Sequence, residues 1–105
     1  MSEEKLKELR EKMEAIQGLE RAPSQNMVFF HLLGTGRTTT VREISGELGL
    51  TPKATERAVA KLLEKGLIQR APFRQRSYTC DNKEVLLSLL VNLSELQKRL
   101  EKRGI

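Results

Sequence analysis

The chain has 105 residues, with 19 basic and 14 acidic side chains for a formal net charge of +5. This length fits one compact domain over residues 1–105, and no stretch approaches the roughly 20 consecutive apolar residues that span a bilayer. One cysteine and one histidine exclude an internal disulfide and a multi-cysteine metal site. The start Ser2-Glu3-Glu4 is unlike a basic signal peptide. We therefore expect a cytoplasmic protein with no cofactor and no membrane contact.

The positive charge is concentrated in one part of the chain. Residues 51–80 carry a net charge of +5, equal to the excess of the whole chain, whereas the segments before and after them are nearly balanced. A localised basic face is typical of a protein that binds a polyanion.

The first predicted helix covers residues 1–18. Ser2 is suited to cap it and Gly18 to end it. Its apolar residues recur at gaps of three and four, which gives a narrow stripe on a charged helix that needs a partner surface. This stripe consists of Leu6, Leu9, Met13 and Ile16.

A second helix opens at Pro23 and is expected to end at Gly34. Its run Met27–Leu33 is apolar on more than one face, as is typical of a helix at the centre of a small core. His31 lies in this run, and nothing near it in the sequence offers a partner. We interpret it as a packed core or boundary residue rather than a ligand or a pH switch.

The segment after the second helix contains three β-branched residues, Thr38–Thr40, which predict a very short strand. Thr40 and Glu43 then form a capping-box pattern at the start of a third helix. Its buried side is expected to comprise Val41, Ile44 and Leu48.

A fourth helix is predicted over residues 52–65. Gly49 supplies the turn before it, Thr51 its N-cap and Pro52 its first position, and Gly66 ends it. Its inward face is expected to comprise Thr55, Val59, Leu62 and Leu63.

Two short alternating segments, 67–70 and 77–80, flank the basic loop 71–76 and predict a β-hairpin. Phe73 and Tyr78 are open to two interpretations, stacking on nucleic acid or the commoner role of filling a core and fixing the hairpin. Cys80 is interpreted as a small buried hydrophobic residue, with a redox-sensing thiol as the alternative.

The last predicted helix covers residues 81–103 and begins with a capping pattern from Asp81 to Glu84. Its apolar stripe contains Leu86, Leu89, Leu93, Leu96 and Leu100. We expect its first half to pack on its own domain and its second half on another helix. The two terminal stripes can pair within one chain or across a two-fold axis. We expect the dimer, because narrow leucine stripes on charged helices are typical of coiled-coil interfaces.

The order of elements over residues 23–80 predicts a mainly α fold with a small β-hairpin, an α+β winged helix-turn-helix. The segment Leu48–Arg70 resembles winged-helix regulators of the MarR, ArsR and TrmB type. Its most specific parts are the glycine turn into a Thr-capped helix and the exit Leu-Leu-Glu-Lys-Gly-Leu-Ile-Gln-Arg. The resemblance implies a prokaryotic, often archaeal, transcription regulator that binds a near-palindromic site as a homodimer. This sequence departs from the family pattern at Glu56, where the family favours an uncharged polar residue. No small-molecule effector is evident from the sequence.

The fourth helix is expected to lie in the major groove of double-stranded DNA, with the wing 70–77 near the minor groove or the backbone. Arg57 can pair bidentately with guanine, whereas Lys53 and Lys61 are better suited to phosphates. The resemblance implies base-facing positions at Lys53, Ala54 and Arg57. The expected DNA-binding residues are Thr51, Lys53, Ala54, Arg57, Lys61, Arg70, Arg74, Gln75 and Arg76. The expected dimer interface is Leu6, Leu9, Met13, Ile16, Leu86, Leu89, Leu93, Leu96 and Leu100.

Two other functions remain open at this point, and no catalytic constellation points to an enzyme. A nucleoid protein that coats DNA with little sequence preference is one, because Ala54, Ala58 and Ala60 offer few atoms for reading bases. A protein-interaction module is the other, because a fold alone does not establish DNA binding.

Overall fold

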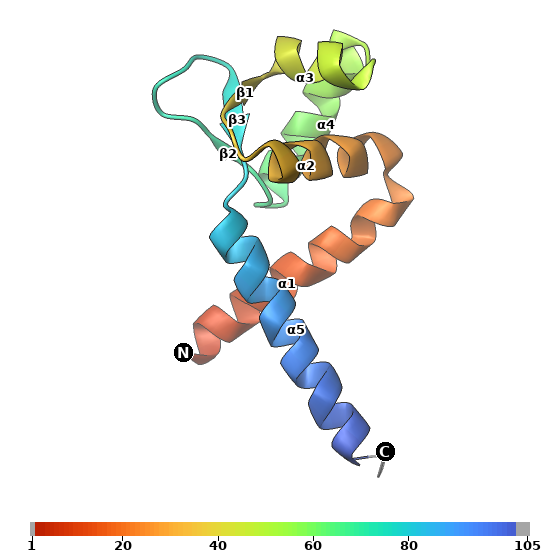
Figure 1. Cartoon of the computed structure of the whole chain (residues 1–105), viewed down its shortest axis with the longest axis vertical. Coiled ribbons are helices and arrows are strands. Elements are labelled where there is room, and N and C mark those ends of the chain that lie inside the picture. Colours follow the sequence, from red (N-terminus) through yellow and green to blue (C-terminus); the bar gives the residue numbers. More distant parts are fainter. Residues whose placement is uncertain (1, 103–105) are drawn as a thin grey trace.

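The computed structural model describes residues 2–102, and these form a mainly helical fold with one small sheet (Figure 1). The expected end of the last helix at residue 103 lies outside the described residues. In chain order the elements are α1 (Glu3–Gly18), the 3-10 helix η1 (Leu19–Arg21), α2 (Pro23–Thr35), β1 (Thr39–Thr40), α3 (Val41–Leu48), α4 (Pro52–Glu64), β2 (Gln69–Arg70), β3 (Ser77–Thr79) and α5 (Asn82–Lys102). The architecture is the expected winged helix.

Most helix ends form where local chemistry predicts them. The side chains of Ser2, Thr40 and Thr51 each accept a hydrogen bond from a backbone N–H in the first turn of the following helix. The expected end of α2 at Gly34 is wrong by one position, since the helix continues to Thr35. Gly36 takes the left-handed conformation (φ 63°) that closes this helix, and a residue without a Cβ adopts it at little cost.

The sheet joins the threonine segment to the hairpin. Its strand order is β1-β3-β2, and both pairings are antiparallel. Thr39 lies opposite Tyr78 in one pairing, and Gln69 lies opposite Thr79 in the other. The short strand expected at Thr38–Thr40 therefore forms as an edge strand on the wing, which ties the start of α3 to the hairpin.

The main core lies between α2, α3 and α4 and is closed by the hairpin. Phe29 and Leu32 of α2 are fully buried in it. Ile44, Val59 and Leu62, three of the residues expected to face inward, are also buried there. The core also includes Leu19, Val28, Ala58, Leu67, Ile68, Tyr78, Cys80 and Val85. Leu19 was not expected in the core, because the sequence predicted only a break after Gly18. The short helix η1 forms there instead, and Leu19 is fully buried.

The two terminal helices cross each other beside this core (Figure 1). Leu9 and Met13 of α1 are buried within the single chain, as are Val85 and Ser88 of α5. Lys5 Nζ lies 2.7 Å from Glu84 Oε1, and Arg10 pairs with Glu95. The buried hydroxyl of Ser88 donates to the Glu84 carbonyl oxygen at 2.8 Å, which satisfies its hydrogen-bonding capacity locally. Part of the α1 stripe is thus covered by α5 of the same chain.

The leucine stripe of α5 lies on a different face from the one that α1 covers. Its members are between 40% and 58% exposed, and so is Leu90 beside them. The five leucines of the stripe are Leu86, Leu89, Leu93, Leu96 and Leu100. The described part of the chain therefore leaves a long apolar face on α5.

The neighbouring residues Phe29 and Phe30 provide a test of the core. Phe29 is fully buried whereas Phe30 is 49% exposed, and their rings meet edge to face with centroids 5.2 Å apart. We predict that Phe29→Ala lowers the free energy of unfolding by about 3–5 kcal/mol, and that Phe30→Ala lowers it by about 1 kcal/mol. Urea unfolding followed by circular dichroism measures both, and equal losses would contradict this description of the core.

Candidate nucleic-acid interface

The N-terminal end of α4 is held in place by a compact set of hydrogen bonds. Gly49 has φ 69° and turns the chain after α3. The hydroxyl of Ser45 donates to the Leu50 carbonyl oxygen at 2.6 Å, and the Ala54 N–H donates to Thr51 Oγ1 at 3.1 Å. The buried hydroxyl of Thr55 returns a bond to the Thr51 carbonyl oxygen at 3.0 Å. These contacts fix the direction of α4 relative to α3, as a helix-turn-helix requires.

α4 has a buried face and an exposed face. Thr55, Ala58, Val59 and Leu62 are buried. Ala58 therefore belongs to the core, and our sequence interpretation, which counted it among the alanines available to DNA, was wrong on this point. Lys53, Arg57 and Lys61 are exposed, together with Glu56 and Ala60.

The basic side chains on and near α4 differ in whether they already have a polar partner within the domain. Lys61 Nζ lies 3.6 Å from Glu64 Oε2, and Lys65 Nζ donates to Gln25 Oε1 at 2.6 Å. Within residues 2–102, neither Lys53 nor Arg57 pairs with a carboxylate. These two side chains can therefore meet an external anion without breaking an existing ion pair.

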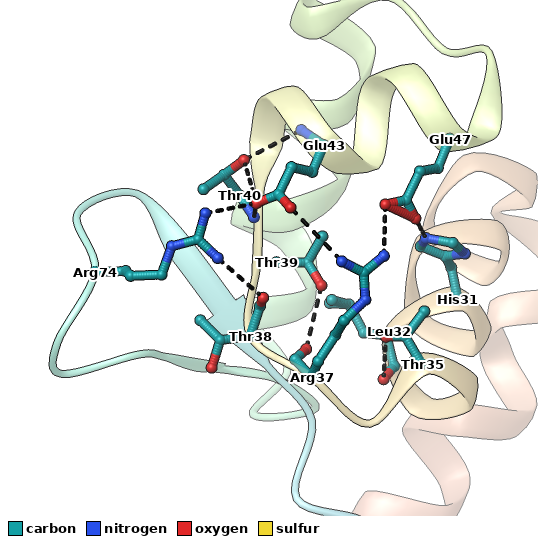
Figure 2. Close-up of polar contacts among 10 residues, drawn as sticks. All are labelled: His31, Leu32, Thr35, Arg37, Thr38, Thr39, Thr40, Glu43, Glu47 and Arg74. Atoms are coloured by element: carbon teal, nitrogen blue, oxygen red, sulfur yellow. Dashed lines mark hydrogen bonds and ion pairs between the residues drawn. The ribbon is translucent and has the colours of Figure 1, made fainter.

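The wing is tied to the rest of the domain by one of its own arginines (Figure 2). Arg74 Nη2 lies 2.8 Å from Glu43 Oε1 on α3, and its Nη1 donates to the Thr38 carbonyl oxygen at 3.3 Å. Ser77 Oγ donates to the Arg74 carbonyl oxygen at 2.7 Å. Arg76 adopts φ 52°, a conformation that is uncommon outside glycine. Arg74 therefore has partners within the domain, whereas Arg76 is exposed and forms no ion pair with any described residue.

A cleft of about 800 Å³ runs between α3, the start of α4 and the wing. Its basic lining consists of Arg42 from α3 with Arg70 and Arg76 from the wing, and Glu56 also borders it. Sequence reasoning missed Arg42 because it lies outside the basic segment 51–80. Arg42 lies in the first turn of α3, directly after β1, and β1 pairs with the wing strand β3. This closeness to the predicted threonine strand was the available indication that Arg42 lies near the wing. The cleft brings helix and wing cations onto one side of the molecule.

A second set of ionic contacts joins α2 to α3 (Figure 2). His31 Nε2 lies 2.6 Å from Glu47 Oε2, and Arg37 Nη2 lies 2.7 Å from Glu47 Oε1. Arg37 also approaches Glu43, with Nη1 and Oε2 3.6 Å apart. The expectation that His31 lacks a partner is wrong, because its partner comes from a different helix. His31 nonetheless lies at the boundary of the core, as expected.

These contacts lower the pKa values of both glutamates. For Glu43 the largest cause is the hydrogen bond from the Thr40 backbone N–H, followed by the Thr40 hydroxyl and then Arg74. For Glu47 the hydrogen bond from Arg37 is the largest cause, followed by the one with His31. Each contact favours the ionised carboxylate, so protonation of either glutamate weakens the network.

Cys80 and Tyr78 belong to the core. Tyr78 is 7% exposed and Cys80 is 8% exposed. Burial raises the pKa of the Cys80 thiol to about 11, and the thiol donates weakly to the Leu67 carbonyl oxygen at 3.6 Å. At neutral pH the thiol is therefore protonated, which disfavours the redox-sensing alternative.

The lowered pKa values predict an acid-sensitive domain. A carboxylate with a folded pKa below its unfolded value of about 4.3 contributes stability above that value, and this contribution is lost as the pH falls through the folded pKa. We predict that the free energy of unfolding decreases between about pH 5 and pH 3, and that the double variant Glu43→Gln, Glu47→Gln shows a smaller decrease. Urea titrations at each pH measure the free energy of unfolding of both proteins.

The double variant Glu11→Gln, Glu56→Gln, at two exposed carboxylates, controls for the change in net charge. An acid-induced loss of stability that is the same in the double variant and in the unmodified protein would show that the network does not contribute.

None of the helices within residues 2–102 combines the length and apolar character needed to cross a membrane. In the same part of the chain, no three His, Cys, Asp or Glu side chains are grouped to hold a metal ion.

Comparisons with known proteins agree with this architecture. The structure is similar to that of Lactococcus lactis ZitR (a C30AH42A mutant in apo form), with a TM-score of 0.51 at 21% identity over 88% of this chain and 72% of that chain. It is also similar to Staphylococcus aureus MepR, with a TM-score of 0.54 at 21% identity over 89% and 75% of the two chains. A search of curated protein sequences found no match. Residues 27–69 match the model of the winged helix-turn-helix DNA-binding family.

Proposed function

We propose that this protein is a homodimeric transcription regulator that places α4 in the major groove of DNA and the wing beside the minor groove or the backbone. The match of residues 27–69 to the winged helix-turn-helix DNA-binding family model supports DNA binding. MepR, which shares the fold, is a transcription regulator of a multidrug efflux pump, and the resemblance of Leu48–Arg70 to winged-helix regulators supports the same role.

The observation that carries the proposal is the position of the available cations. Lys53 and Arg57 project from the exposed face of α4 without ion pairs among the described residues. The cleft lined by Arg42, Arg70 and Arg76 borders the same helix at Pro52 and Glu56. A duplex that receives α4 in its major groove would meet these wing and α3 cations at its phosphates.

The residues of this surface have different expected roles. The planar fork of Arg57 matches O6 and N7 of guanine, which makes it the main candidate for reading a base. Lys53, together with the N–H groups at the start of α4, suits a phosphate. Lys61 would exchange its weak surface pair with Glu64 for a phosphate at little cost.

Binding measured over a salt series distinguishes these roles. We predict that Lys53→Ala weakens binding to all duplexes and reduces the salt slope by about 0.9, the value for one lost phosphate contact. We predict that Arg57→Ala costs roughly 1–3 kcal/mol on a selected target duplex and relaxes specificity at one base pair. Fluorescence anisotropy with labelled duplexes measures both, and the exposed α1 residue Lys7 supplies the control variant Lys7→Ala.

The unmodified protein decides between the candidate functions in the same assay. Equal affinity for selected and random duplexes, with a steep salt slope, would indicate the DNA-coating protein. Absence of binding to any duplex would contradict DNA binding and favour the protein-interaction module.

The dimer part of the proposal is supported by the α5 leucine face. Leu86, Leu93 and Leu100 recur every seven residues, and the face they define with Leu89 and Leu96 stays exposed after α1 has packed on α5. A second copy of the same face would cover it in the manner of a coiled coil. Since Leu9 and Met13 are already buried within the chain, we assign the interface to α5 with α1 as its support.

A charge introduced into this face tests the dimer. We predict that Leu93→Glu sediments as a monomer at micromolar concentrations while its circular dichroism spectrum is unchanged, because a carboxylate would be buried without a partner in the dimer. Ser94→Glu adds the same charge at an exposed neighbouring position and should remain dimeric. Sedimentation as a monomer by the unmodified protein would contradict the proposed dimer and its two half-sites about 10 base pairs apart.

A further inference from the structure

The tip of the wing presents an aromatic ring to solvent. Phe73 is 96% exposed, whereas Phe29 and Tyr78 are buried and Phe30 is about half exposed. Among the described residues it is the most exposed large hydrophobic side chain. The core-filling role considered for both aromatic residues of the hairpin therefore applies to Tyr78 and not to Phe73.

The loop that carries Phe73 is anchored rather than free. The next residue, Arg74, is held by Glu43 and by the Thr38 carbonyl oxygen, and the Ala71 N–H donates to the Ser77 carbonyl oxygen at 2.9 Å. Pro72 restricts the backbone directly before the ring. An anchored loop loses less conformational entropy when its tip makes a contact, which favours binding through Phe73.

The charged residues of the hairpin that carries the ring are all basic. Arg70, Arg74 and Arg76 lie within the same hairpin, and the sequence contains no acidic residue between Glu64 and Asp81. The wing also borders the cleft shared with α3 and the start of α4, so a duplex bound to α4 would pass beside it. The charge and the position both favour DNA as the partner of this tip.

We propose that Phe73 inserts as a wedge between two stacked base pairs from the minor groove and bends the duplex, an inference that rests on the proposed DNA binding. Proteins that enter the minor groove use apolar side chains in this way, and the unstacked step kinks the DNA. Arg76 and Arg70 would hold the phosphates on either side, while Arg74 acts as a positioning residue through Glu43. Flexible pyrimidine–purine steps such as TA or CA would be preferred beneath the wing.

The test compares Phe73→Ala and Phe73→Leu with the unmodified protein on a duplex of about 30 base pairs labelled at both ends, so that energy transfer reports the bend. We expect Phe73→Ala to lower affinity roughly tenfold with an unchanged salt slope, because the lost contact carries no charge, and to reduce the bend. Phe73→Leu should retain most of the affinity and most of the bend. Arg76→Ala should instead reduce the salt slope by about 0.9, and Phe30→Ala, which removes an exposed ring outside the wing, should change neither affinity nor bend.

A second readout locates the wedge. 2-Aminopurine placed at a TA step should become brighter on binding of the unmodified protein, since its fluorescence increases on unstacking, and should not do so with Phe73→Ala. A Phe73→Ala variant that binds and bends DNA as the unmodified protein does would overturn the wedge and leave the proposed function standing. If Phe73→Ala binds and bends DNA normally but no longer binds phosphatidylserine–phosphatidylcholine vesicles that the unmodified protein binds, the ring would be assigned to a lipid surface. If the unmodified protein binds no duplex, the wedge and the proposed function fail together.

Discussion

The carboxylate of Glu43 is the contact on which the arrangement of helix-turn-helix and wing depends. It accepts hydrogen bonds from the backbone N–H and the hydroxyl of Thr40 and so completes the first turn of α3. The same side chain pairs with Arg37 and Arg74. A capping box is local, whereas the contact with Arg74 joins residues 31 positions apart. The correct start of one helix and the orientation of the wing are therefore coupled through one group.

The local features of this fold were predictable because their chemistry lies within a few residues. Ser2, Thr40 and Thr51 cap helices through bonds to N–H groups three positions away. Gly49 and Gly66 turn the chain with positive φ, as the sequence indicates. The end of α2 shows the limit of such reasoning, because Gly36 closes the helix where Gly34 was expected to do so. Both glycines permit the turn, and only the packing of the last helical turn decides which one adopts it.

Contacts between distant parts of the chain were not predictable in the same way. The terminal helices carry similar stripes, yet Leu9 is buried whereas Leu93 is exposed, because periodicity identifies an apolar face without its partner. His31 acquires Glu47 through the packing of α2 on α3. For the candidate interface, the charge pattern indicated α4 and the wing. It did not indicate that Arg74 is engaged by Glu43 or that Arg42 joins the cleft, since both depend on tertiary structure.

The projection of α5 from the domain (Figure 1) has a mechanical consequence for the proposed dimer. With 21 residues and a rise of about 1.5 Å each, the helix is a lever about 31 Å long. A rotation of about 10° centred near Leu100, at the C-terminal end of the leucine face, would displace the start of the helix by about 5 Å, a distance comparable to one and a half base-pair steps. The separation of the two α4 helices would then be set at a surface remote from DNA. Small changes in leucine packing would alter which spacing of half-sites the two copies span.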